Sequence, residues 1–186
     1  MSKFFNFKAF IKPTSFKINK GNIKLVKEKE DYSVKYPNAM EGHIRIDQES
    51  DGINIHLNKD FPSEDPIVIN LNSLQTCNVN LESGVLRSEG LCPNMTVKVN
   101  SGTLSAKISK HNIASVKAHV NTGVLNNRSD LQPSHSHEGQ SFGNFWEMNM
   151  GVSFNNHVEL MGTGSSHATF QVDIGTMDLF SVSSSL

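Results

Sequence analysis

Long apolar stretches are missing from this 186-residue sequence. No run of about 18 apolar residues occurs, which excludes a membrane-spanning helix from the printed chain. The first twenty residues also lack the unbroken apolar core and the small-residue cleavage site of a secretory signal, so we expect none. Cysteine is scarce as well. Cys77 and Cys92 show neither the spacing of a zinc knuckle nor a disulfide framework, so we expect two reduced thiols at half-buried strand positions.

Acidic side chains are absent from one part of the chain. Residues 1–27 carry seven lysines and no Asp or Glu, whereas residues 28–186 carry ten Lys or Arg against eighteen Asp or Glu. A basic arm therefore precedes an acidic body, although the net charge of the whole chain is only −1. Nucleic-acid grooves need a clustered basic face with aromatic side chains, so we expect no nucleic-acid partner.

Catalytic signatures are also missing. The "GTGSS" segment at 162–166 lacks the strand-to-helix elbow of the hydrolases and the lysine of a phosphate loop. His135, His137 and Glu138 could offer ligands to a metal ion, but two or three groups on one loop do not make a site. We therefore expect no enzyme, no catalytic residue, no resident metal and no cofactor.

The most regular feature of the sequence is a repeated turn. The segments "LESGVL" at 81–86, "VNSGTL" at 99–104 and "VNTGVL" at 120–125 share an apolar residue, a polar residue, any residue, a glycine and a strand-like pair. Weaker copies occur at 18–23, 148–153 and 172–177. Glycine reaches positive φ without the Cβ penalty, as a tight reversal between strands requires. The predicted structural turns are Gly21, Gly84, Gly102, Gly123, Gly151 and Gly175.

The spacing of these turns predicts the fold class. Strand–turn–strand units that recur about every 20 residues cannot bury their apolar faces alone and must stack. The prediction is an all-β, single-domain β-solenoid with rungs of about 20 residues. Ordinary hairpin turns in an antiparallel sandwich remain the alternative. In a stack, residues two before each glycine form a column, in which the acids would lie at opposite ends. These residues are Glu82, Asn100, Asn121, Asn149 and Asp173.

A family resemblance rests on the segment "VNLESGVLRSEGLCPNMTVKVNSGTLSAKI" at 79–108. It resembles the bacterial domain of unknown function usually labelled a "putative adhesin", similar forms of which occur in a few eukaryotic proteins of mitochondrial type. The similarity extends over residues 40–180 and is strongest at 79–125. It implies a β-solenoid and assigns no active site.

The predicted domain organisation is a basic aromatic arm at 1–17, a solenoid domain at 18–182 and a tail at 183–186. A long loop interrupts the solenoid at 126–146. The arm is either helical or extended, and an amphipathic helix there would suit a partner groove or an anionic membrane surface. The predicted partner contacts combine the arm and the loop. They are Lys3, Phe4, Phe7, Lys8, Phe10, Ile11, His135, His137, Phe145 and Trp146.

Three functions are compatible with this sequence. The first is a non-enzymatic structural or accessory subunit that binds other protein subunits, with a mitochondrial location, or alternatively a cytoplasmic one. The second is an adhesin-like module that binds a surface or a ligand. The third, a carbohydrate-active enzyme on a β-helix, would need several acids or a calcium-bound cluster on one face, and the short acidic clusters here are typical of solvated turns.

Overall fold

The computed structural model describes residues 2–5, 13–29, 32–58, 65–72, 74–134 and 153–181. Within these ranges the chain is all-β, as predicted, and its strands join in one mixed 12-stranded sheet. A 3-10 turn at Asn38–Met40 is the one helical element in the same ranges. No helix among the described residues is long and apolar enough to cross a membrane.

Five strands are long and bent, and the others are short. The long strands are β2 (Ser15–Val26), β7 (Thr76–Ser88), β8 (Asn94–Ile108), β9 (Ile113–Arg128) and β12 (Ser166–Ser181). The short strands are β1 (Ser2–Phe5), β3 (Ser33–Pro37), β4 (Ile44–Gln48), β5 (Gly52–Leu57), β6 (Ile67–Asn70), β10 (Gln132–Pro133) and β11 (Ser153–Met161).

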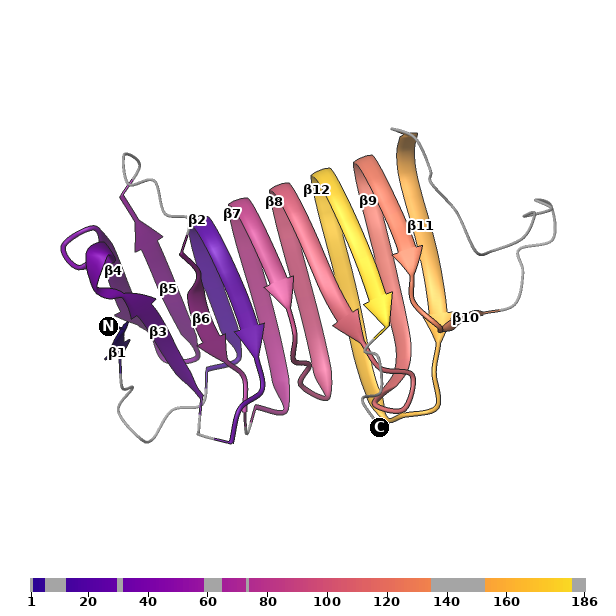
Figure 1. Ribbon diagram of the computed structural model, residues 1–186, viewed down its shortest axis with the longest axis horizontal. Coiled ribbons are helices and arrows are strands. Elements are labelled where there is room, and N and C mark those ends of the chain that lie inside the picture. The colour runs from indigo at the N-terminus through magenta and orange to yellow at the C-terminus, as the bar shows by residue number, and fades with distance from the viewer. Residues whose placement is uncertain are drawn as a thin grey trace.

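The five long strands lie side by side in the order β2-β7-β8-β12-β9, and we call this group the stack. Every neighbouring pair in the stack is parallel and keeps its register on both sides of the repeated glycine. Figure 1 shows each long strand running along one layer, bending over the top edge and returning along the other. The stack therefore has two layers with equivalent residues aligned along its long axis.

Strand β8 shows how the sequence produces this bend. Met95, Val97 and Val99 are buried before Gly102, and after it the buried positions move to Leu104, Ala106 and Ile108. The step from Val99 to Leu104 is odd, so the period-two alternation changes phase at the bend and both halves turn their apolar side chains inward. These side chains belong to one continuous core cluster between the layers.

The repeated glycines form a column at the bend. Gly21, Gly84, Gly102, Gly175 and Gly123 are partners across successive strands, and all five have φ between 133° and 143°. A Cβ built on Gly102 would lie 1.9 Å from the carbonyl oxygen of Gly84. The close approach of neighbouring backbones thus requires glycine, in addition to the positive φ. Each glycine lies inside a continuous strand rather than in a separate turn.

Strand β12 does not follow the order of the chain. It lies between β8 and β9 and pairs with both of them along nearly its whole length. Asp173 consequently lies between Asn100 and Asn121, whereas the sequence analysis placed it at the end of the polar column. That prediction was wrong because it assumed stacking in chain order. Asn149 of the same column lies outside the described residues.

Short strands cover the two ends of the stack: β5 and β6 run parallel to β2 at one end, and the other short strands join by antiparallel pairing. At one end, the first half of β2 pairs with β5 and its second half pairs with β6, while β4 pairs with β5. β3 then pairs with β6 and β1 pairs with β3. At the other end, β11 runs antiparallel to the first half of β9 and β10 pairs with β11. Such pairing satisfies backbone groups that an open end would leave exposed.

The N-terminal arm is extended where the structure describes it. Residues Ser2–Phe5 form β1 and not the beginning of a helix, so for these four residues the extended alternative holds. Strand β2 starts at Ser15 and crosses the domain boundary expected after residue 17. Residues 6–12, with the predicted contacts Phe7, Lys8, Phe10 and Ile11, lie outside the described residues.

Candidate ligand-binding face

The first halves of the stacked strands present an array of polar side chains on their outer surface, which we call the outer polar face. In-register pairing places these side chains in rows that cross β7, β8, β12 and β9 in turn. One row is Thr76, Asn94, His167 and Ser115, the next is Asn78, Thr96, Thr169 and Lys117, and the third is Asn80, Lys98, Gln171 and His119. Neighbouring strands lie about 4.8 Å apart, so the members of a row can contact one ligand together.

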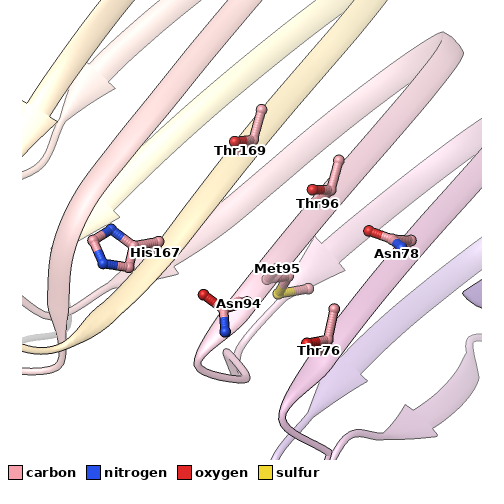
Figure 2. A pocket seen from close by; sticks show the side chains of 7 residues that line it. All are labelled: Thr76, Asn78, Asn94, Met95, Thr96, His167 and Thr169. Carbon is pink, nitrogen blue, oxygen red and sulfur yellow. The ribbon is translucent and has the colours of Figure 1, made fainter. Parts of the chain in front are cut away.

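A shallow hollow of about 220 Å³ lies in the lower part of this face. Figure 2 shows its lining side chains on three neighbouring strands, with β8 in the middle. The lining consists of Thr76, Asn78, Asn94, Met95, Thr96, His167 and Thr169. Hydroxyl and amide groups, which both donate and accept hydrogen bonds, therefore predominate, and no carboxylate, lysine or arginine is among these seven residues.

His167 is held at one side of the hollow by a neighbour from β9. The hydroxyl of Ser115 lies 2.9 Å from Nδ1 of the His167 ring. The backbone N–H of His167 also donates to the carbonyl oxygen of Pro93, at 2.7 Å, in the connection that leads into β8. These two contacts hold both the ring and the backbone of His167 in place.

Asp173 organises the upper part of the outer polar face, close to the bend. Its carboxylate accepts hydrogen bonds from Gln171 at 2.7 Å and from Asn121 at 2.9 Å, and it forms an ion pair with Lys98 at 3.0 Å. His119 in turn contacts the amide oxygen of Asn121. Partial burial raises the pKa of Asp173, but Lys98, Gln171 and the nearby His119 together hold that pKa below its ordinary value. The carboxylate is thus kept ionised and its hydrogen-bonding capacity is largely used within the protein.

The outer surface of the other layer has a different chemistry. Glu89 lies between two lysines, with Lys24 at 2.7 Å and Lys107 at 3.3 Å. The hydrogen bond from Lys24 is the largest cause that lowers the pKa of Glu89, and Lys107 adds to it. Nearby, Arg87 donates to the amide oxygen of Asn22 at 2.9 Å. This surface is charged and paired, whereas the hollow is polar and neutral.

The two cysteines lie beneath the hollow. Both are 0% exposed, so neither is half-buried as expected, and Cys92 lies in the connection before β8 rather than in a strand. Their thiols contact one another. The contact with Cys92, followed by burial, raises the pKa of Cys77. The hydrogen bond from Cys77 is the main cause that lowers the pKa of Cys92.

The sequence-predicted site residues have separate positions in the structure. The glycines Gly21, Gly84, Gly102, Gly123 and Gly175 form the column at the bend. Lys3 and Phe4 belong to β1, on the far side of β3 from the stack. The remaining predicted residues lie outside the described part of the chain. They are Gly151, Phe7, Lys8, Phe10, Ile11, His135, His137, Phe145 and Trp146.

The outer polar face was missed by the sequence analysis. A signal for it exists, because aligning the repeats on their glycines also aligns Asn78 with Thr96 and Thr169 at polar, outward positions. The position of His167 beside Asn94 could not be found in this way. It depends on the insertion of β12 next to β8, which the repeat pattern does not encode.

Comparison with known proteins gave likenesses in structure alone. No protein-family model matches the chain, and no curated protein matches it significantly. Among solved structures, a "putative cell adhesion protein" from Clostridium sporogenes is 11% identical, with a TM-score of 0.49 over 98% of this chain and 99% of that one. A "putative adhesin" from Bacteroides fragilis is 8% identical, with a TM-score of 0.45 over 96% of each chain.

Proposed function

We propose that this chain is an adhesin-like binding module whose outer polar face binds a neutral, hydroxyl-rich ligand, namely a carbohydrate chain. The observation that carries the proposal is the hollow formed in register by β7, β8 and β12 and lined mainly by amide and hydroxyl groups. A sugar offers hydroxyl groups that donate and accept at the same time. Thr, Asn and His side chains can satisfy both roles without a charged partner.

The regular spacing of the face supports an extended ligand. Rows of polar side chains continue from the hollow toward Lys98 and Gln171, so a chain of several sugar units would find equivalent partners along its length. A rigid sheet fixes these groups in advance, which reduces the entropy that binding must overcome. Several weak contacts can then add to a useful affinity.

We further propose that the stack is a β-solenoid in which each long strand supplies one rung. The in-register parallel pairing and the glycine column support this description. The rungs would not be wound in chain order, because β12 lies between β8 and β9. The short strands would act as caps for the two ends.

Binding without catalysis is part of the proposal. Glycoside hydrolysis generally uses two carboxyl groups that flank the bond to be broken. The hollow has none among its lining residues, and the carboxylate of Asp173 is engaged by Lys98 and Gln171. The accessory-subunit interpretation, with its mitochondrial or cytoplasmic location and possible membrane contact, depends largely on arm and loop residues outside the described ranges and stays a prediction.

The experiment is a glycan-array screen with the full chain, followed by calorimetric titration of a retained oligosaccharide. The test variant is Thr96→Ala with Thr169→Ala, which removes two paired hydroxyls from the hollow. The control variant is Thr103→Ala with Thr176→Ala, a pair on the same two strands but beyond the bend. We expect the test variant to weaken binding at least about tenfold, equivalent to about 1.4 kcal/mol, and the control to leave it unchanged.

Two results would overturn the proposal. The first is the absence of any carbohydrate binding on the array by the correctly folded chain. The second is an equal loss of affinity in both double variants, which would indicate a general effect on the sheet rather than contact in the hollow. Because each variant replaces one paired threonine from each of β8 and β12, their effects on strand propensity should be similar.

A further inference from the structure

The connection between β7 and β8 brings the chain's two cysteines together. Thr76 and Asn94 are partners across these strands, and Cys77 is next in sequence to Thr76. The thiol of Cys92 donates to the carbonyl oxygen of Asn94 at 3.3 Å. Backbone pairing and this hydrogen bond therefore hold Cys92 against Cys77, and the two side chains are in contact within the core.

The start of the same connection is held by a local contact and by β2. Ser88 donates its hydroxyl to the carbonyl oxygen of Gly90 at 3.0 Å, and the backbone N–H of Glu89 donates to Leu25 of β2 at 2.8 Å. A Cβ built on Gly90 would lie only 2.5 Å from the backbone nitrogen of Lys27. The chain between the two cysteines is thus already folded into the shape that brings the sulfur atoms together.

We propose that Cys77 and Cys92 are a disulfide-forming pair, whose oxidation ties the β7–β8 connection to the floor of the polar hollow. In the described structure both are free thiols. The oxidant is a small disulfide such as oxidised glutathione. The Cys92 thiolate attacks one sulfur of the oxidant and releases one glutathione, which forms a mixed disulfide. Cys77 then attacks the Cys92 sulfur and displaces the second glutathione.

Electrons and protons balance in this exchange. The two protein thiols lose two electrons and two protons, and the oxidant gains both as two glutathione thiols. Cys92 suits the first step because it lies outside the strands, in the β7–β8 connection, whereas Cys77 is held within β7. The lowered pKa of Cys92 favours its thiolate form. The raised pKa of Cys77 keeps that group protonated during the first step, so it reacts second.

The test measures the equilibrium between dithiol and disulfide in buffers of reduced and oxidised glutathione. The full chain has only two cysteines, so alkylation followed by mass spectrometry counts each state without ambiguity. The same equilibrium constant is then measured in denaturant. Because a fold that holds the thiols together favours the bond, we expect the constant to be at least tenfold higher in the folded protein.

A ratio below tenfold overturns the proposal, as does a folded chain that forms only dimers linked through the cysteines. Cys77→Ser and Cys92→Ser serve as controls, since neither can form the internal bond. A second readout follows the backbone N–H of Asn94, which donates to Gln75 at 3.0 Å. Its hydrogen exchange should slow at least threefold on oxidation, and an unchanged rate would contradict the claim that the bond secures this connection. Sugar binding is not part of either readout, so the test stands apart from the proposed function.

Discussion

At the scale of single residues, the glycine column shows two separate requirements for glycine. One is the positive φ that all five members share, and the other is the lack of space for a side chain. Gly102 has both, with the carbonyl oxygen of Gly84 at 1.9 Å from an ideal Cβ. Gly21 begins the column and has only the first, because the nearest atom to its Cβ would be 3.7 Å away.

This difference predicts unequal costs for the same substitution. Gly21→Ala should lower the free energy of unfolding by about 1–3 kcal/mol, the usual cost of an unfavourable backbone conformation. Gly102→Ala should cost clearly more, because its methyl group would collide with the backbone of Gly84 and force β7 and β8 apart at the bend. Urea denaturation of both variants measures the difference. Equal losses would mean that the strands can separate freely and that only φ matters at the bend.

Asp173 illustrates a residue whose charge supports the fold. Its folded-state pKa is lowered, so its contribution to stability is present at neutral pH, above the unfolded pKa of about 4. This contribution is lost as the pH falls through the lower folded-state pKa, because the carboxylate is then protonated. The ion pair is partly exposed, with the Lys98 side chain 40% and the Asp173 side chain 27% accessible. Its contribution to the free energy of unfolding is therefore modest.

A double-mutant cycle with Asp173→Asn and Lys98→Met tests this reasoning. At pH 7 we expect a coupling energy of up to about 1 kcal/mol between the two side chains, typical of partly exposed pairs. As the pH is lowered well below 4, the coupling should disappear because Asp173 becomes neutral. Thermal unfolding across this pH range supplies the values. A coupling that persists in acid would show that packing, not charge, connects the two residues.

At the scale of elements, β12 and β4 represent opposite environments within one sheet. β12 bonds to β8 on one side and to β9 on the other, and its inward residues Ala168, Phe170 and Val172 are buried. Among the described strands, β4 pairs with β5 alone. The last described strand is therefore in the interior of the stack, while the early strand β4 lies outside the stack at an edge of the sheet.

Hydrogen exchange should reveal this contrast directly. Amides of β12 are expected to exchange only through global unfolding, together with those of β8, because both strands are bonded on two sides. Amides of β4 should exchange at least tenfold faster through local opening. Mass-spectrometric exchange with peptide resolution measures both. If β12 exchanged as early as β4, the interior position of the last strand would be contradicted.

At the scale of the whole molecule, the sequence predicted the units better than their arrangement. Glycine at near-constant spacing between alternating segments was enough to predict an all-β chain with its glycines aligned. The order of the strands was not predictable, because every repeat carries the same pattern. By that pattern alone, β12 could pair with any of the other long strands. Its place is determined by long-range contacts and connections, such as the antiparallel pairing of β11 with β9.

The candidate site was also predictable only in part: its polar positions follow from the sequence, but their arrangement does not. Outward Thr and Asn positions follow from the alternation, but the hollow needs His167 next to Asn94 and the thiol pair beneath it. Both depend on which strands are neighbours. The residues that the sequence favoured as partner contacts are aromatic and basic, and they attract notice because they are exceptional in composition. The hollow is made of ordinary polar residues whose significance comes only from their positions in three dimensions.

The interior position of β12 has a consequence for mechanical load. A pull on the C-terminal end, directed along the strand, would strain the hydrogen bonds to β8 and β9 together, in shear, and would not open them one after another. In a stack wound in chain order, the last strand would instead lie at the end. It could then detach by breaking its hydrogen bonds to a single neighbouring strand. A force applied at the end of β12 would therefore act on two rows of hydrogen bonds at once, those to β8 and those to β9.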